Sequence, residues 1–146
     1  MRKVIQSTMW TLGIFVSGFV VGNVHQTAST VSAQAGGRVF ELRTYTAPAG
    51  KLEELHARFR NHTRRIFDRH GMTSVGYWRP TDTPLSENTM VYLLSFPNRE
   101  AAKKSWDEFR ADPEWQKVSQ ESQVNGTLVS KVESVFLEPT DYSPMK

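Results

Sequence analysis

The segment TMVYLLSF, Thr89 to Phe96, places the strongest limit on how this 146-residue chain can fold. Its aromatic and β-branched residues predict a strand, bounded by Asn88 before it and Pro97 after it. Side chains alternate across a strand, so the even-numbered residues from Met90 to Phe96 lie on one face, and Val91 and Leu93 lie on the other. A sheet that contains this strand needs an apolar cover on both sides.

Three further segments have the alternation and composition of strands. Proline, glycine and asparagine residues separate them from their neighbours, as expected of turns. The last of them follows the turn-forming pair Asn125-Gly126. The three predicted strands are Val39–Thr46, Thr73–Arg79 and Thr127–Leu137.

Two helical regions alternate with these strands. The first runs from Lys51 to His70, and Gly71 supplies the expected left-handed stop. The second follows Asn98, a good capping residue, and restarts at Asp112-Pro113. In the first helix the predicted inner residues are Leu52, Leu55, Phe59, Ile66 and Phe67, and the predicted outer ones are Glu53, Glu54, Arg58, Arg60, Arg64 and Arg65.

The resulting order is strand, helix, strand, strand, helix, strand. It predicts an α+β, ferredoxin-like fold, β-α-β-β-α-β, with an antiparallel sheet and both helical regions on one face. The helices leave the second face of the sheet uncovered. Each apolar side chain left in water would lose the roughly 1.5 to 3 kcal/mol of free energy that its burial contributes. We therefore expect a homodimer in which two copies pack sheet to sheet.

Five short motifs carry a family resemblance across nearly the whole chain after the first 35 residues. In order they are FELRTYT (Phe40–Thr46), GKLEEL (Gly50–Leu55), RHG (Arg69–Gly71), VGYW (Val75–Trp78) and ADPEWQ (Ala111–Gln116). This set resembles the NIPSNAP family of the dimeric α/β-barrel superfamily. The sequence departs from the family pattern at Leu94, where a tryptophan is more usual.

The resemblance implies a NIPSNAP-like domain over residues 36–138, pairing as a dimeric α/β barrel, with an irregular C-terminal tail at 139–146. It also implies a function class. Family members have been tied to protein interaction and trafficking, whereas the superfamily includes cofactor-independent monooxygenases, haem-degrading enzymes and dehydratases. We expect an exported module that binds a small ligand or a protein. The alternative is a cofactor-independent monooxygenase or isomerase acting on a small hydrophobic substrate.

Three polar side chains alternate along the first predicted strand, namely Glu41, Arg43 and Tyr45. Because Phe40 and Leu42 suit the helix-covered face, we expect the polar three to face the partner copy. Three roles are then open to them. They could form a cross-strand or intersubunit ion pair, bind an anionic or carbonyl-bearing ligand, or lie at a solvent-exposed rim of the sheet. The predicted ligand contacts are Glu41, Arg43, Tyr45, Tyr77 and Tyr92, since aromatic walls with a few polar groups suit a small hydrophobic ligand.

The first helix carries all three histidines that follow residue 35, and no two of them have the spacing of a metal-chelating pair. With no cysteine in the chain, no metal site or cofactor is expected. His62 falls between Phe59 and Ile66 on the predicted inner stripe. It is therefore the candidate catalytic base, and a hydrogen-bonded core histidine is the alternative.

Charge and motifs exclude several function classes. The net charge is +3, but Arg2 and Lys3 precede the domain, and without them 16 basic residues face 15 acidic ones. This balance does not favour a nucleic-acid partner. The chain also lacks the short motifs of serine hydrolases, zinc peptidases, and dinucleotide- and nucleotide-binding proteins.

The first 35 residues have the pattern of a signal peptide. Two basic residues precede an uncharged run from Met9 to Val24, and Ala33-Gln34-Ala35 suits cleavage after Ala35. The 16-residue run is short for a membrane span, which needs about 20 apolar residues. We expect export to a periplasmic or extracellular space. The alternative is an anchor formed by residues 4–24, the only arrangement in which we expect membrane contact.

Cleavage of this leader is testable in a bacterial host. The full chain should be recovered from the soluble exported fraction, because cleavage removes the only long apolar run, and N-terminal sequencing should begin near Gly36. Recovery solely as an intact, membrane-bound chain would instead support the anchor.

Overall fold

The computed structural model describes residues 37–146; the expected leader at residues 1–35 lies outside this range. The described part follows the predicted order, with one additional short helix, α3, in the loop before the third strand. No helix in it is long and apolar enough to cross a membrane. The elements are β1 (Val39–Thr46), α1 (Leu52–Arg58), η1 (Phe59–Thr63), α2 (Arg64–Arg69), β2 (Thr73–Trp78), α3 (Leu85–Asn88), β3 (Thr89–Phe96), α4 (Arg99–Ala111), α5 (Pro113–Glu121) and β4 (Lys131–Leu137).

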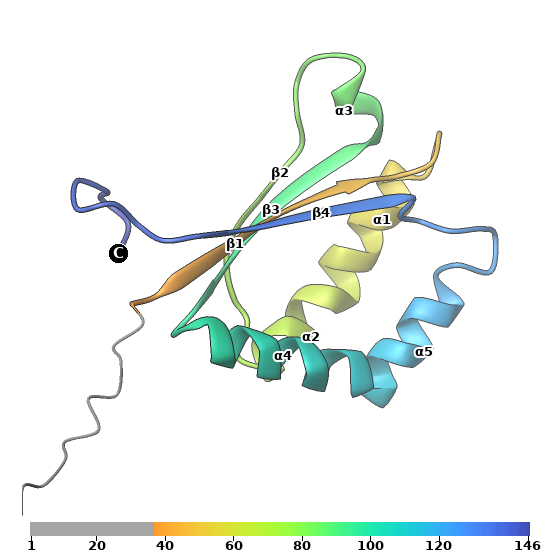
Figure 1. The fold of residues 1–146 in the computed structure, drawn as a ribbon. Coiled ribbons are helices and arrows are strands. Elements are labelled where there is room, and N and C mark those ends of the chain that lie inside the picture. Colours follow the sequence, from red (N-terminus) through yellow and green to blue (C-terminus); the bar gives the residue numbers. More distant parts are fainter. Residues whose placement is uncertain (1–36) are drawn as a thin grey trace, which may run out of the picture. The chain divides into compact units, whose positions relative to one another are not determined.

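The four strands form one antiparallel sheet in the order β2-β3-β1-β4. The long helices α1, α2, α4 and α5 lie on one side of this sheet (Figure 1). Strand β1 is hydrogen-bonded along its whole length to β3 and along most of it to β4. The predicted ferredoxin-like fold is therefore confirmed, with β1 as a central strand.

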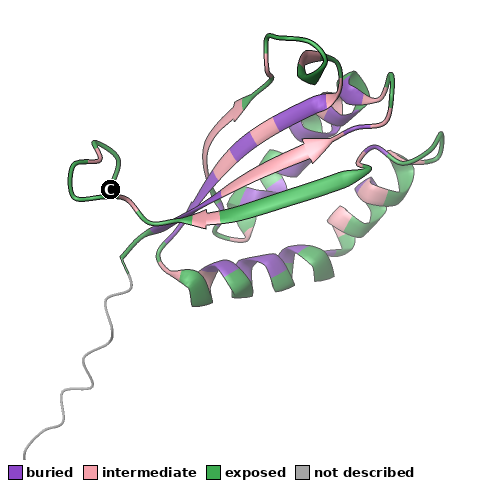
Figure 2. Ribbon diagram, turned by 45° about the horizontal axis from the view of Figure 1, so that its top comes forward, coloured by how far each residue is buried: buried purple, intermediate pink, exposed green. Residues whose placement is uncertain are grey.

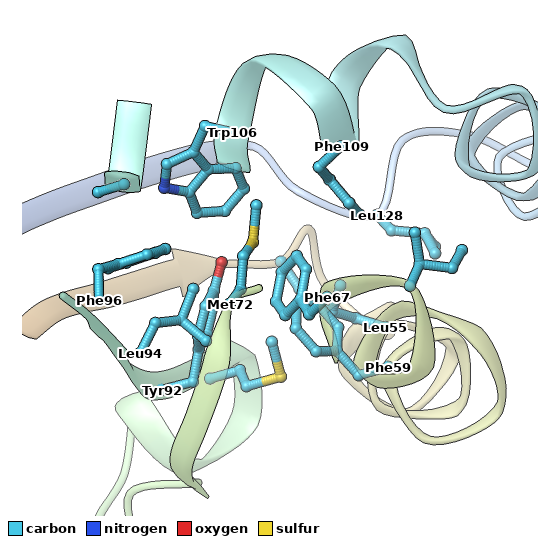
Figure 3. Close-up of a cluster of buried hydrophobic side chains, with 14 of the residues drawn as sticks. Leu55, Phe59, Phe67, Met72, Tyr92, Leu94, Phe96, Trp106, Phe109 and Leu128 are labelled. Atoms are coloured by element: carbon cyan, nitrogen blue, oxygen red, sulfur yellow. The ribbon is translucent and has the colours of Figure 1, made fainter. Parts of the chain in front are cut away.

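The core fills the space between the helices and the sheet. Met90, Tyr92, Leu94 and Phe96 are buried on the helix-facing side of β3, as predicted. Figure 3 shows Tyr92 and Leu94 pointing into a cluster that includes Phe59 and Phe67 from the first helical region and Trp106 and Phe109 from α4. Several of these rings meet edge to face, a favourable aromatic geometry that adds to the burial of apolar area.

The other side of the sheet, here called the open face, carries no helix (Figure 1). Val91 and Leu93 are half-buried on it, and Trp78, Val135 and Leu137 are 52%, 54% and 41% exposed. Figure 2 shows β4 exposed along nearly its whole length. The open face is thus apolar across several strands, as the alternation in β3 predicted.

The predicted orientation of β1 is wrong. Glu41, Arg43 and Tyr45 lie opposite the helix-facing residues Leu94, Tyr92 and Met90 of β3, and residues directly opposite each other in an antiparallel pair share a face. The three polar residues therefore face the helices, and Phe40, Leu42 and Thr44 lie on the open face. Apolar character did not reveal the inner face of β1, because both faces of this sheet are apolar.

Asp112 joins three elements where α4 gives way to α5. Its Oδ1 accepts hydrogen bonds from the backbone N–H groups of Glu114 and Trp115, which confirms the predicted N-cap of α5. Its Oδ2 accepts from Arg69 and His70 at the end of the first helical region, each at 2.6 Å. The hydrogen bond from His70, together with those from Arg69 and the cap, holds the pKa of this carboxyl well below its usual range.

Removing this carboxylate should weaken the fold. Asp112→Ala should lower the free energy of unfolding by about 1 to 2 kcal/mol, the usual cost of losing a helix N-cap. Asp112→Asn should cost less because its amide oxygen can still cap α5. Urea unfolding measures both, and Asp107→Asn, in exposed ion pairs on α4, is the matched control that should change little.

The Asp112 contribution should also depend on pH. A carboxyl whose folded pKa lies below its unfolded value of about 3.9 stabilises the fold fully above that value. The stabilisation is lost as the pH falls through the folded pKa. The difference between wild type and Asp112→Asn should therefore shrink as the pH falls below about 4. A difference that does not shrink there would contradict this role.

Candidate functional site

A buried carboxylate lies at the centre of the polar groups between sheet and helices. Glu41 is 1% exposed and accepts three hydrogen bonds. Trp106 of α4 donates through Nε1 to Oε2 at 2.5 Å, and Ser134 of β4 and Arg43 each donate to Oε1 at 2.6 Å. The ion pair expected for Glu41 and Arg43 exists, but it joins two residues of the same strand rather than two strands or two subunits.

Arg43 connects this carboxylate to a pair of tyrosines. Its Nη2 donates to the Tyr45 hydroxyl at 3.3 Å, and its guanidinium lies 4.3 Å from the centre of the Trp106 ring. Tyr92 also donates to the Tyr45 hydroxyl, at 2.9 Å. Burial raises the pKa of Tyr92 well above its usual range, so this phenol stays a neutral donor. Tyr45 thus accepts two hydrogen bonds and retains its own O–H proton to donate elsewhere.

Beside Tyr45 lies a cavity of about 200 Å³, here called the inner cavity. The sheet, the first helical region, α4, α5 and the segment before β4 all contribute to its walls. The walls are mostly aromatic and aliphatic with a few polar groups, the usual composition of a small-molecule site. The lining residues are Tyr45, Arg58, Phe59, Thr63, Phe67, Phe109, Trp115, Ser119, Gln123, Val129 and Val132.

Arg58 lines this cavity although the sequence analysis placed it on the outer side of its helix; that placement is wrong, since the residue is only 7% exposed. It lies three residues after the buried Leu55, a spacing that shares a helix face and could have indicated the burial. The π-helical segment η1 follows at once, and Phe59, its first residue, is buried as well. Such segments occur often at functional sites.

His62 is exposed, so its predicted place on the inner stripe is also wrong. In η1 the N–H of Arg64 bonds to the carbonyl of Phe59, five residues back, and this wide turn brings Thr63 rather than His62 to the buried side. His62 instead lines an outer groove of about 360 Å³ between the first helical region and α5. Its catalytic role stays a prediction. The enclosed position from which that role was inferred is absent, because the side chain is exposed.

The two other predicted ligand tyrosines lie apart from the inner cavity wall. Tyr92 is fully buried behind Tyr45, which it contacts through its hydroxyl. Tyr77 stacks on Tyr92 at 5.7 Å, bonds to Ser74, and lines a smaller pocket of about 160 Å³. The structure therefore joins Glu41, Arg43, Tyr45 and Tyr92 in one hydrogen-bonded chain and leaves Tyr77 beside it.

The described residues show no cluster of three His, Asp or Glu side chains arranged to hold a metal ion. Within residues 37–146, the polar residues that line the inner cavity are instead Tyr45, Arg58, Thr63, Ser119 and Gln123. Each of these side chains carries at least one hydrogen-bond donor. The arrangement favours an organic ligand that carries an acceptor oxygen.

Solved structures with the same fold include several of the family indicated by the sequence. A NIPSNAP-like domain protein from Burkholderia xenovorans aligns with a TM-score of 0.65 and 22% identity, over 75% of this chain and 90% of its own. A NIPSNAP family protein from Agrobacterium tumefaciens aligns with a TM-score of 0.66 and 23% identity, over 75% and 99%. No significant match occurs among curated proteins.

A cofactor-independent oxygenase shares the fold more distantly. A variant of SnoaB, a cofactor-independent oxygenase from Streptomyces nogalater, aligns with a TM-score of 0.52 and 17% identity, over 73% of this chain and 97% of its own. The NIPSNAP family model matches residues 40–144, nearly the whole described part. The shared fold and this match agree with the five sequence motifs, and the chain belongs to the NIPSNAP family.

Proposed function

We propose that this protein binds a small, largely apolar ligand in the inner cavity of each subunit. The observation that carries the proposal is Tyr45, which lines the cavity and whose hydroxyl accepts hydrogen bonds from Arg43 and Tyr92. Its proton is free to bond to a ligand oxygen, and the Arg43 cation strengthens it as a donor. At about 200 Å³, the cavity is smaller than usual ligand pockets of roughly 300 to 1,000 Å³. A ligand built on one ring suits this volume.

The proposal includes an exported homodimer. The open face supports dimerisation, because it presents apolar side chains such as Trp78, Val135 and Leu137 that no helix covers. The inner cavity lies on the opposite side of the sheet, among residues of one subunit. Pairing through the open face would therefore leave every described cavity residue in place.

A second candidate function is a cofactor-independent oxygenase or isomerase. The pairing of Arg43 with Tyr45 favours it, since such donors can stabilise negative charge that develops on a substrate oxygen. The shared fold with SnoaB, an oxygenase, is consistent with this candidate but shows no activity. The exposed His62 lies outside the inner cavity, so a reaction there would need a different base.

The Tyr45 contact can be tested by native mass spectrometry of freshly purified protein. We expect a bound small molecule, with occupancy reduced in Tyr45→Phe because the donor to its oxygen is lost. The same variant should lose about 1 kcal/mol of stability, since Tyr92 and Arg43 lose their acceptor. Tyr142→Phe, on the 84%-exposed tail tyrosine, is the matched control.

The recovered molecule also separates the two candidate functions. A binding protein should return it unchanged after incubation in air, whereas an oxygenase should consume dioxygen and change its mass, and an isomerase should yield an isomer of equal mass with a different chromatographic retention. If no small molecule co-purifies, and no small aromatic alcohol, ketone or acid binds when added, ligand binding in this cavity is refuted.

The homodimer can be tested by sedimentation of residues 36–146 at micromolar concentration. Wild type should sediment as a dimer, and Val135→Glu should shift it toward monomer because a carboxylate would be buried in an apolar interface. Val124→Glu, at a 77%-exposed site before β4, should remain dimeric. A monomeric wild type would rule out the sheet-to-sheet pairing.

A further inference from the structure

The side chain of Arg58 is a buried cation that lacks a protein counter-ion. No carboxylate of residues 37–146 forms an ion pair with it, and its Nε is buried with no hydrogen-bond partner. Its closest polar contact is a long hydrogen bond, 3.4 Å, from Nη1 to the Ser122 hydroxyl. Burial lowers the pKa of Arg58 below its usual value, because removing the cation from water disfavours its charged form. Buried charges are normally paired, so an unpaired guanidinium in a cavity wall indicates a missing anion.

The charges around the inner cavity do not balance without that anion. The Glu41 carboxylate is already paired with Arg43, at 2.6 Å, also accepts from Trp106 and Ser134, and forms no ion pair with Arg58. Two carboxylates line the neighbouring outer groove: Glu54 pairs with Lys51 at 2.8 Å, and Glu121 lies 3.9 Å from Lys117 in an exposed pair. Neither forms an ion pair with Arg58, so its charge has no ion-pair partner among residues 37–146.

The shape of the site restricts the chemistry of the anion. The Trp115 ring lies 5.3 Å from the guanidinium and, with Phe59, Phe67 and Phe109, forms apolar walls that suit an aromatic body. A planar guanidinium edge matches a carboxylate, which it can hold through two parallel hydrogen bonds. A phosphate dianion would bring two negative charges to a site that offers one positive charge.

We propose that Arg58 binds the carboxylate of a small aromatic carboxylic acid, whose ring occupies the inner cavity beside Tyr45. This inference rests on the proposed ligand-binding function and specifies the ligand class. Arg58 lines both the inner cavity and the outer groove. The carboxylate therefore lies near the groove between the first helical region and α5, with the ring directed toward the aromatic core.

Calorimetric titration of the full chain tests this with benzoate and phenylacetate as probes. The neutral isostere benzamide and inorganic phosphate serve as comparison ligands. We expect one of the carboxylates to bind at least about tenfold more tightly than benzamide, as a charge-assisted bidentate contact requires. Arg58→Met should remove that preference, and Arg58→Lys should keep part of it. Arg60→Met, at an exposed arginine of the same helical region, should bind like wild type.

Thermal unfolding without ligand separates binding from structure. If Arg58 serves the ligand, Arg58→Met should melt at the same temperature as wild type or higher, because it removes an unpaired charge from the interior. A lower melting temperature with unchanged carboxylate binding would show a structural role and overturn the proposal.

The remaining outcomes are equally decisive. If benzamide and the carboxylates bind equally well and Arg58→Met changes neither, the anion site is refuted, while ligand binding in the inner cavity remains supported. Tighter binding of phosphate than of either carboxylate would refute the carboxylate class. Failure of every probe, with no co-purified molecule, would refute the proposed function together with this inference.

Discussion

The Glu41 carboxylate is the interaction on which the arrangement of this domain depends. Burying a carboxylate at 1% exposure costs free energy unless neighbouring groups donate hydrogen bonds to its oxygens. Here the donors come from β1, β4 and α4. Arg43 supplies the opposite charge and passes a hydrogen bond on to Tyr45. One buried acid thus fixes the sheet, the covering helix and the phenol that faces the inner cavity.

The first helical region shows how a small departure from regular geometry shapes a site. A uniform helix would follow one apolar stripe, but the wide turn of η1 changes the phase between Phe59 and Thr63. Arg58 and Phe59 are both buried, while His62 is exposed. The inner cavity therefore has a cation in its wall, and its neighbouring outer groove has the histidine.

Many features of the fold follow from local chemistry that the sequence displays directly. Asn98 and Asp112 cap α4 and α5, and Gly71 adopts the positive φ that ends the first helical region. These signals act over a few residues, so they survive without tertiary information. The order of the elements predicted the ferredoxin-like topology. The candidates identified from the sequence included every residue of the hydrogen-bonded chain, namely Glu41, Arg43, Tyr45 and Tyr92.

The sequence by itself determined the order of elements, their caps and the alternation of side chains along each strand. Only the tertiary structure decided which face of β1 meets the helices, because alternation defines two faces and both are apolar here. The pairing of Arg43 with Tyr92 in the sheet settled that choice. It likewise decided the exposure of His62, since the wide turn of η1 forms where the helix packs against α5, and long-range packing is absent from local sequence patterns.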